Sequence, residues 1–211
     1  HLPRIEGHRQ GAESARVIIR TAGDLGIKYL TLYAFSAENW NRPKDEVDAL
    51  MKYLIHYLKS ETPDLNKNNV RLDAIGQIYR LPENVQEQLK KSIATLAKNN
   101  GLTLVLALSY GGRNEIVEAV RGIAEKVRRG QLEPSDITEQ TVSQHLWTRH
   151  LPDPDLLIRT SGEMRVSNFL LWQISYAEFV ITPTLWPDFR KPQLYAALEE
   201  YAKRHRRFGG V

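Results

Sequence analysis

Apolar residues along this chain recur with a helical period in some stretches and form short continuous runs in others. A helical period covers residues 11–26, and an apolar and aromatic run, Tyr29 to Phe35, follows it. The expected strands are 29–35, 70–75, 102–109, 156–159 and 179–182, and the expected helices are 11–26, 43–58, 82–98, 114–129 and 193–207. Strands and helices alternate, which predicts an α/β fold.

The run Leu102 to Leu108 is apolar at almost every position instead of alternating. Strands covered on both faces, as in parallel sheets, have this composition. We therefore expect a central, mostly parallel sheet flanked by helices, in a single domain spanning 1–211. Ligands of such sheets gather beyond the carboxyl ends of the strands. Three polar segments that follow strands, 36–43, 109–114 and 160–168, are accordingly the places to look for chemistry.

The composition is ordinary for a soluble globular protein, with 42% hydrophobic and 26% charged residues among 211. No stretch reaches the roughly 18 apolar residues of a membrane span. The chain has no cysteine, which excludes disulfides and thiolate chemistry and favours the cytoplasm, at most peripheral to the inner face of the membrane. A net charge of +4 permits an anionic ligand and does not require nucleic acid.

The segment after the first strand carries hydroxyl, carboxylate, amide, indole and guanidinium side chains. They belong to Ser36, Glu38, Asn39, Trp40 and Arg42. A capped loop with a solvated face would have a similar composition. The composition of this segment alone does not decide between the two.

The segment from Arg159 to Asn168 adds two arginines and several hydroxyls after another strand. Ser167 is a suitable cap for a helix beginning at Asn168. The planar fork of arginine matches phosphate oxygens, and a helix amino terminus adds amide donors, so the segment is consistent with an anion site that includes Arg159 and Arg165. The alternative is a pair of surface arginines bound to carboxylates.

Other motifs of common enzymes are missing from the sequence. It contains no Walker loop, no dinucleotide fingerprint, no His-Glu-x-x-His and no Gly-x-Ser-x-Gly. The turn from Tyr110 to Arg113 is interpreted as a tight strand-to-helix turn without a ligand. The six histidines have no metal-ligand spacing.

Five longer blocks occur in a fixed order over nearly the whole chain. They are PRIEGHRQG at 3–11, LTLYAFSAENWNRP at 30–43, SYGGR at 109–113, DLLIRTSGEMRVSNFLLWQISYAE at 155–178, and LWPDF at 185–189 with RRFGG at 206–210. In these blocks the chain resembles the undecaprenyl diphosphate synthase family of cis-prenyltransferases. The resemblance implies chain elongation by successive cis-condensation of isopentenyl diphosphate onto an allylic primer, usually farnesyl diphosphate.

The resemblance also implies roles for individual residues. Ser36 and Asn39 would assist removal of the proton from isopentenyl diphosphate, and Glu178 would be a Mg²⁺ ligand. The expected substrate-binding residues are Arg4 and His8 for the primer diphosphate, Arg159, Arg165, Val166 and Ser167 for isopentenyl diphosphate, and Ser36, Ala37, Glu38, Trp40 and Arg42 beside them. Arg207 and Gly209 would reach the diphosphate site across the interface of a homodimer.

The resemblance further implies a hydrophobic tunnel with Ile27, Val70 and Leu102 among its positions. The expected product is a polyprenyl diphosphate near C55, a lipid-carrier precursor for cell-wall synthesis that is delivered to the membrane. The family carries an Asp-Gly-Asn-Gly-Arg-Trp-Ala segment, with a metal-binding aspartate, just before the stretch that begins here. That segment is missing from this sequence, so we expect residues 1–211 alone to be catalytically impaired.

Two alternatives remain open. A non-catalytic partner subunit of a heteromeric cis-prenyltransferase would also lack the aspartate segment, although it would have little use for the residues of a complete isopentenyl diphosphate site. A nucleic-acid or anionic-membrane binder would rely on the basic residues alone, and its affinity would depend steeply on salt.

Overall fold

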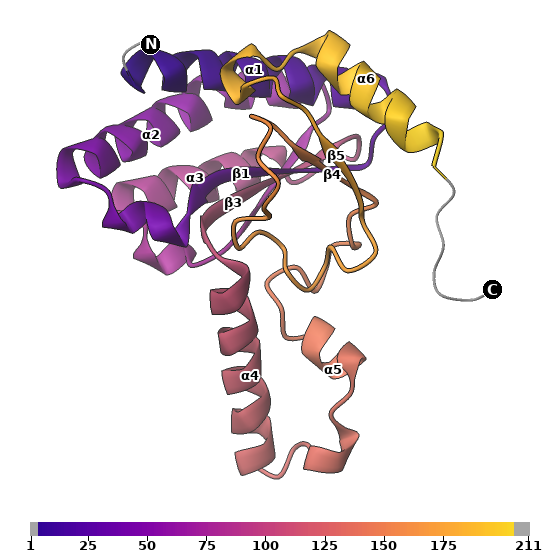
Figure 1. Ribbon diagram of the computed structural model, residues 1–211. Coiled ribbons are helices and arrows are strands. Elements are labelled where there is room, and N and C mark those ends of the chain that lie inside the picture. Colours follow the sequence, from indigo (N-terminus) through magenta and orange to yellow (C-terminus); the bar gives the residue numbers. More distant parts are fainter. Residues whose placement is uncertain (1–3, 205–211) are drawn as a thin grey trace.

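The computed structural model describes residues 4–204, apart from the side chains of residues 4–6 and 8, and confirms the predicted α/β architecture. The helices and strands are α1 (Arg4–Asp24), β1 (Tyr29–Ser36), α2 (Lys44–Lys67), β2 (Arg71–Ile75), α3 (Glu83–Leu96), β3 (Thr103–Tyr110), α4 (Gly112–Arg128), α5 (Glu139–Ser143), β4 (Leu156–Arg159), β5 (Glu178–Ile181) and α6 (Lys191–Ala202). A short 3-10 helix, η1 (Ala37–Asn41), follows β1 directly. Figure 1 shows the helices packed around the strands, while α4 runs away from them with α5 beside it.

All strand pairs are parallel, as the apolar run in β3 predicts. The strands form a three-stranded sheet in the order β1-β3-β2 and a separate two-stranded sheet, β4-β5. Tyr29 and Arg71 both lie opposite Thr103, so the three strands of the larger sheet begin at the same level. Within residues 4–204, β1 pairs only with β3 and β4 pairs only with β5. One edge of β1 and one edge of β4 are therefore not covered by another described strand.

The core explains why β3 is apolar throughout. Every residue from Leu104 to Tyr110 is buried. Leu104, Leu106 and Leu108 belong to a cluster with residues of α1, α2 and α3 on one face of the sheet. Val105 and Ala107 belong to a second cluster on the other face, with residues of β4 and of the segment that follows it. The expectation of a strand covered on both faces is confirmed.

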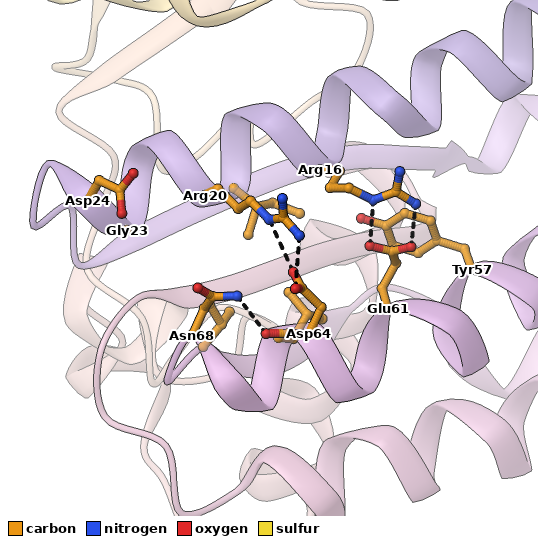
Figure 2. Close-up of a pocket in the computed structure, with 11 residues that line it drawn as sticks. Arg16, Arg20, Gly23, Asp24, Tyr57, Glu61, Asp64 and Asn68 are labelled. Carbon is orange, nitrogen blue, oxygen red and sulfur yellow. Dashed lines mark hydrogen bonds and ion pairs between the residues drawn. The ribbon is translucent and has the colours of Figure 1, made fainter.

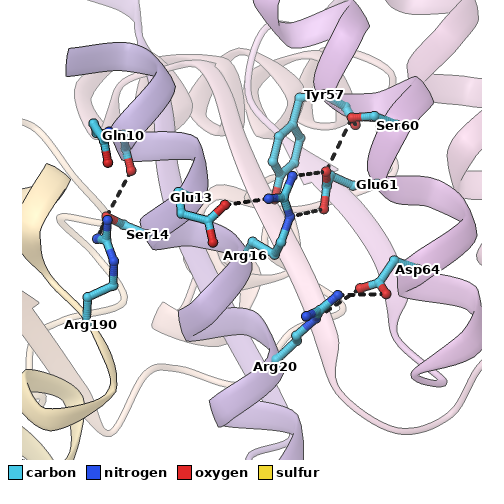
Figure 3. Close-up of polar contacts among 10 residues, drawn as sticks. All are labelled: Gln10, Glu13, Ser14, Arg16, Arg20, Tyr57, Ser60, Glu61, Asp64 and Arg190. Atoms are coloured by element: carbon cyan, nitrogen blue, oxygen red, sulfur yellow. Dashed lines mark hydrogen bonds and ion pairs between the residues drawn. The ribbon is translucent and has the colours of Figure 1, made fainter. Parts of the chain in front are cut away.

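Ion pairs join α1 to α2 around a small pocket of about 120 Å³. Arg16 donates two hydrogen bonds to the carboxylate of Glu61, Nε to Oε2 at 2.9 Å and Nη2 to Oε1 at 2.6 Å, and also contacts Glu13. One turn further along, Arg20 donates to both carboxylate oxygens of Asp64 at 3.1 and 2.8 Å (Figures 2 and 3). Glu61 is only 5% exposed, so its pairing with Arg16 is a precondition for its burial.

The structure corrects one expectation for the segment after β4. Ser167 does not cap a helix, because residues 167–176 form turns instead of a helix. Ser167 and Asn168 both have positive φ angles, +48° and +62°, which lie in the left-handed region and cannot start a right-handed helix. The proposed anion site therefore has no helix amino terminus at this position, and its donors must come from side chains and from the irregular backbone.

Within residues 4–204, no helix has both the length and the apolar composition that crossing a membrane requires.

Candidate functional site

The three polar segments that follow strands lie together, as their positions at the carboxyl ends of parallel strands predict. Trp40, after β1, donates a hydrogen bond from Nε1 to Oγ of Ser109, near the end of β3, at 2.8 Å. Asn168, from the segment after β4, donates from Nδ2 to Oε1 of Glu38 in η1 at 2.7 Å. The backbone N–H of Arg113 donates to Oδ1 of the same Asn168 at 2.8 Å. Residues far apart in the sequence thus form one polar region.

Ser36 and Asn39 are held relative to one another within η1. The backbone N–H of Ser36 donates to Oδ1 of Asn39 at 3.0 Å, which closes the turn between β1 and η1. Because the amide oxygen of Asn39 is used in this way, its NH₂ group is the end that can donate to a diphosphate. Neither side chain is basic at neutral pH, so any part in proton removal must come from positioning and hydrogen bonding.

The side chain of Trp40 packs against the hydrophobic core and does not line the large cavity that lies beside β1. Its ring packs edge-on against Phe35, with centroids 4.9 Å apart, and the guanidinium of Arg80 lies 5.5 Å above the ring centroid. Together with the hydrogen bond to Ser109, these contacts fix the indole on three sides. Its predicted contact with substrate stays a prediction, whereas its role in anchoring η1 is visible in the structure.

A cavity of about 1420 Å³ runs along the facing edges of β1 and β4. All residues of β1 from Tyr29 to Ala34 and of β4 from Leu156 to Arg159 contribute to its wall, with apolar residues of α2 and α6. Ligand pockets typically hold about 300–1,000 Å³. Arg42, Arg159 and Thr160 also line this cavity, and they add polar groups to a predominantly apolar space.

The three predicted tunnel positions are divided between the cavity and the core. Ile27 lines the cavity. Val70 and Leu102 are 2% and 3% exposed and belong to the core cluster between the sheet and the helices. Leu102 does not line the cavity. Of the three predicted positions, Ile27 alone lines this cavity, and the tunnel itself stays a prediction.

Arg159 is the clearest candidate for an anion-binding group. It ends β4, lines the cavity, and its Nε is buried without a hydrogen-bond acceptor in the described part of the chain. Buried donors of this kind are rare in folded proteins, and a ligand is one of the explanations for them. An anion at this end of the cavity would accept the bond that the protein itself does not provide.

Two other predicted arginines, Arg42 and Arg165, already have carboxylate partners. Arg42 pairs with Glu46 at 2.9 Å, and Arg165 pairs with Glu163. The side chain of Arg165 is 67% exposed, while its neighbour Val166 lines the cavity. Binding of a diphosphate by Arg165 would require exchange of Glu163 for phosphate oxygens, which the exposure of both side chains permits.

Two titratable groups near η1 are perturbed by their surroundings. Burial raises the pKa of the Tyr33 phenol to about 12, and the nearby charge of Glu38 adds to this effect. Burial alone would raise the pKa of the Glu38 carboxyl, but hydrogen bonds, that from Asn168 foremost, hold this pKa below its usual value. At neutral pH the region thus contains a neutral phenol beside an ionised carboxylate.

Glu178, the predicted metal ligand, begins β5 and lies 2.8 Å from Arg204. It pairs in register with Leu156, whereas Arg159 pairs with Ile181. Glu178 and Arg159 are therefore about 10 Å apart along the strand direction, at roughly 3.3 Å per residue. No three His, Cys, Asp or Glu residues of the described part are arranged to hold a metal ion. A single carboxylate is still compatible with Mg²⁺, which often binds one or two carboxylates together with substrate phosphates.

Several predicted residues cannot be placed. Arg4 lies in the first turn of α1 and His8 about one turn further along, but their side chains are outside the described part. Arg207 and Gly209 fall outside the described residues altogether. Ala37 lies in η1, close to Gly111, where an added Cβ would be 3.4 Å from its methyl group.

Sequence reasoning missed Ser109 and Asn168. Ser109 is fully buried with φ +48°, and Asn168 bonds two other segments. The signal available in the sequence was the Gly111-Gly112 pair, which marks a close approach of the backbone to another group. Its interpretation as a tight turn was too narrow.

Comparisons with known proteins agree with the fold and the cavity described above. A family model described as "Putative undecaprenyl diphosphate synthase" matches residues 1–209. An isoprenyl transferase of Porphyromonas gingivalis is 54% identical over 98% of this chain and 81% of its own length. A ditrans,polycis-undecaprenyl-diphosphate synthase of Micrococcus luteus, specific for (2E,6E)-farnesyl diphosphate, is 49% identical over 100% of this chain and 84% of its own.

Among solved structures, lavandulyl diphosphate synthase from Lavandula x intermedia, in complex with dimethylallyl diphosphate, superimposes with a TM-score of 0.96. It is 44% identical to this chain, and the match covers 99% of this chain and 90% of that structure. The chain therefore belongs to the undecaprenyl diphosphate synthase family of prenyltransferases.

Proposed function

We propose that this prenyltransferase elongates farnesyl diphosphate, or a similar allylic primer, by successive cis-condensation with isopentenyl diphosphate. The product would be a long polyprenyl diphosphate near C55, which serves as a lipid-carrier precursor in cell-wall synthesis. Family membership and the relatives named as isoprenyl transferases support the reaction class. The size of the cavity is compatible with an extended apolar product.

The observation that carries the proposal is the position of Arg159. A donor that is buried, and that finds no acceptor among the described residues, belongs to a side chain lining a large, mostly apolar cavity. A prenyl diphosphate has the matching form, since it combines an anionic head with an apolar chain. Guanidinium groups bind phosphate oxygens through charge-assisted hydrogen bonds, which are stronger than neutral ones.

The neighbouring residues take roles that their positions allow. Arg165 and Ser167, with Val166 between them, would complete the diphosphate site of isopentenyl diphosphate. Asn39 would orient the substrate through its amide NH₂ group, and Ser36 lies beside it. Arg42 would contact the phosphates from the opposite wall of the cavity. Glu38 and Trp40 hold η1 in place through the hydrogen bonds described above, and Ala37 directly precedes Glu38 in the sequence.

Mg²⁺ would be held by Glu178 together with diphosphate oxygens. When bound, the ion would neutralise charge on the diphosphate as it leaves the allylic carbon. Arg204 must first release Glu178, since the two are now an ion pair. The expected homodimer, with Arg207 and Gly209 completing a diphosphate site, and delivery of the product to the membrane are part of the same proposal.

Incorporation of radiolabelled isopentenyl diphosphate, in the presence of Mg²⁺, tests the proposal. The assay is run with farnesyl and with dimethylallyl diphosphate as primers. Two proteins are compared, residues 1–211 and the same chain preceded by the family's Asp-Gly-Asn-Gly-Arg-Trp-Ala segment. We expect long polyprenyl product from farnesyl diphosphate, and much more from the extended protein. Chromatography of the dephosphorylated products reports their chain length.

The negative outcomes are distinct from one another. A folded, extended protein that binds isopentenyl diphosphate but forms no product would favour the partner-subunit alternative. A protein that neither binds the diphosphate nor forms product would overturn the proposed function. Binding of nucleic acid that inorganic diphosphate does not displace would support the third alternative.

A further inference from the structure

One side chain outside the predicted site, that of Asn168, connects all three polar segments. Its amide NH₂ donates to Oε1 of Glu38 at 2.7 Å, and its amide oxygen accepts from the backbone N–H of Arg113 at 2.8 Å. Its backbone carbonyl accepts from the N–H of Gly112 at 2.7 Å. A single residue thus ties the segment after β4 to η1 and to the start of α4.

The backbone around Asn168 is in an unfavourable conformation. Ser167, Asn168 and Leu170 have φ angles of +48°, +62° and +47°. Residues other than glycine adopt this region at a cost in free energy, which asparagine tolerates best. Such conformations persist where the surroundings enforce them, and they concentrate at functional sites. Here the three hydrogen bonds of Asn168 supply the enforcement.

The glycine pair after β3 makes room for this arrangement. Gly111 has an extended backbone, so its φ angle does not require glycine. A Cβ at this position would lie 2.6 Å from Nδ2 of Asn168 and 2.6 Å from Oδ1 of Asn114. The missing side chain is what permits the amide of Asn168 to approach η1. The Gly111-Gly112 turn is therefore part of the junction.

A second contact supports the same connection. The phenol of Tyr33, on β1, donates to the backbone carbonyl of Tyr110 at 3.1 Å and lies 3.4 Å from that of Ser167. Its ring also stacks on Phe169, with centroids 4.5 Å apart. The segment 167–169 is thus packed against β1 and the end of β3 on both sides of Asn168.

We propose that Asn168 is a positioning residue, which keeps the diphosphate-binding segment with Arg165 and Ser167 at a fixed distance from Ser36, at the end of β1, and Asn39, in η1. The inference rests on the proposed function. That function assigns Arg165 and Ser167 to the diphosphate of isopentenyl diphosphate, and Ser36 and Asn39 to the end that loses the proton. Displacement of a reacting group by about 1 Å can lower a rate about 100-fold. Loss of Asn168 should therefore lower kcat more than it weakens binding.

The geometry allows a reciprocal exchange that separates positioning from simple loss of structure. Asn168→Asp removes the donor and places a second carboxylate beside Glu38. Glu38→Gln supplies an amide donor at the other end of the same contact. In the double variant the new amide donates to the new carboxylate, whose second oxygen still accepts from the N–H of Arg113. The net charge of the pair is also restored.

A matched control is available at the opposite end of the sheet. Asn69 also has a positive φ, +55°, and its amide donates to Oδ1 of Asn100 at 2.9 Å. Asn69→Asp makes the same chemical change in the same backbone conformation, in the turn between α2 and β2. We expect its kcat to match that of the unmodified protein.

The test measures kcat and KM for isopentenyl diphosphate in the form of the protein that shows turnover, and calorimetric binding of isopentenyl diphosphate. We expect Asn168→Asp to lower kcat about 10–100-fold with a change in affinity of about threefold or less, and the double variant to recover kcat to within about threefold. If Asn168→Asp keeps its kcat within twofold, or the double variant is no better than the product of the single variants, the inference is wrong. If the unmodified protein neither binds nor turns over isopentenyl diphosphate, the proposed function itself fails.

Discussion

Two arginine-bearing regions of this protein differ in how their charges are satisfied. Between α1 and α2, Arg16 and Arg20 each donate two hydrogen bonds to a carboxylate of the facing helix (Figure 3). At the carboxyl end of β4, the buried Nε of Arg159 has no acceptor within the described residues. Both regions contain arginine side chains. Only between α1 and α2 does the protein supply the carboxylates that these side chains bind.

The comparison shows that the number of arginines does not distinguish a structural ion pair from a binding site. The difference is whether a carboxylate of the protein already binds the guanidinium group. Glu61 is buried and its charge is tolerated because Arg16 is beside it. Those arginines hold two helices together through carboxylates that the protein itself supplies. Arg159 instead has capacity that the fold leaves unused, next to a cavity large enough for a substrate.

The largest effect on stability is expected at the α1–α2 contact. Glu61→Ala should lower the free energy of unfolding by about 1–3 kcal/mol, because hydrogen bonds to a charged partner are lost and Arg16 is left with Glu13 alone. Urea unfolding measures the change. Glu125→Ala removes the carboxylate that pairs with Arg128 and Arg129 on the exposed face of α4, and should leave stability nearly unchanged. Equal losses in both variants would contradict a special role for the helix contact.

Arg159→Met should affect stability in the opposite direction. The substitution removes a buried donor that has no acceptor among residues 4–204, so we expect the free energy of unfolding to stay the same or to rise by up to about 1 kcal/mol. The same urea experiment tests this. A loss of more than about 1 kcal/mol would mean that Arg159 is held by a structural partner, and the contrast with Arg16 would disappear.

A separate effect on stability is expected from pH. Because the pKa of Tyr33 is about 12 in the folded protein, against about 10 in an unfolded chain, the unfolded state loses this proton first as the pH rises. Stability from the buried neutral phenol is complete below pH 10 and is lost between about pH 10 and 12. Tyr33→Phe should remove this pH-dependent contribution to stability. The variant should therefore lose less stability between pH 9 and pH 11 than the unmodified protein. Identical losses would show that Tyr33 does not titrate in this way.

The sequence is sufficient to predict the order of the strands and of the longer helices, although not α5. Parallel pairing is predicted as well, because β3 is apolar from Leu104 to Leu108 on both faces. The sequence also places the segments after β1 and β3 at one edge, since parallel strands of one sheet end at the same side. The segment after β4 follows a strand of a separate sheet, and the hydrogen bonds of Asn168 bring it to the other two. The ends of elements are less well predicted. The first helix begins at Arg4, ahead of the predicted residue 11, and α4 begins at Gly112, before the predicted Asn114.

Other features depend on contacts between distant residues, which no local pattern reveals. Ser167 looks like a helix cap, yet the bonds of Asn168 hold this segment in left-handed backbone conformations. Leu102 looks equally suited to a tunnel or to the core, and packing against the helices places it in the core. The missing acceptor of Arg159 is likewise visible only once its neighbours are known.

Calorimetric titration with isopentenyl diphosphate tests the central claim most directly, because it requires binding and not turnover. Three proteins are compared, the unmodified chain, Arg159→Met and Arg20→Met. The account predicts binding that is weakened about 10–100-fold by Arg159→Met, the loss of one charged hydrogen-bonding group, and is unchanged by Arg20→Met. Equal affinity in all three proteins, or equal losses in both variants, would contradict the assignment of the unsatisfied arginine to the substrate diphosphate.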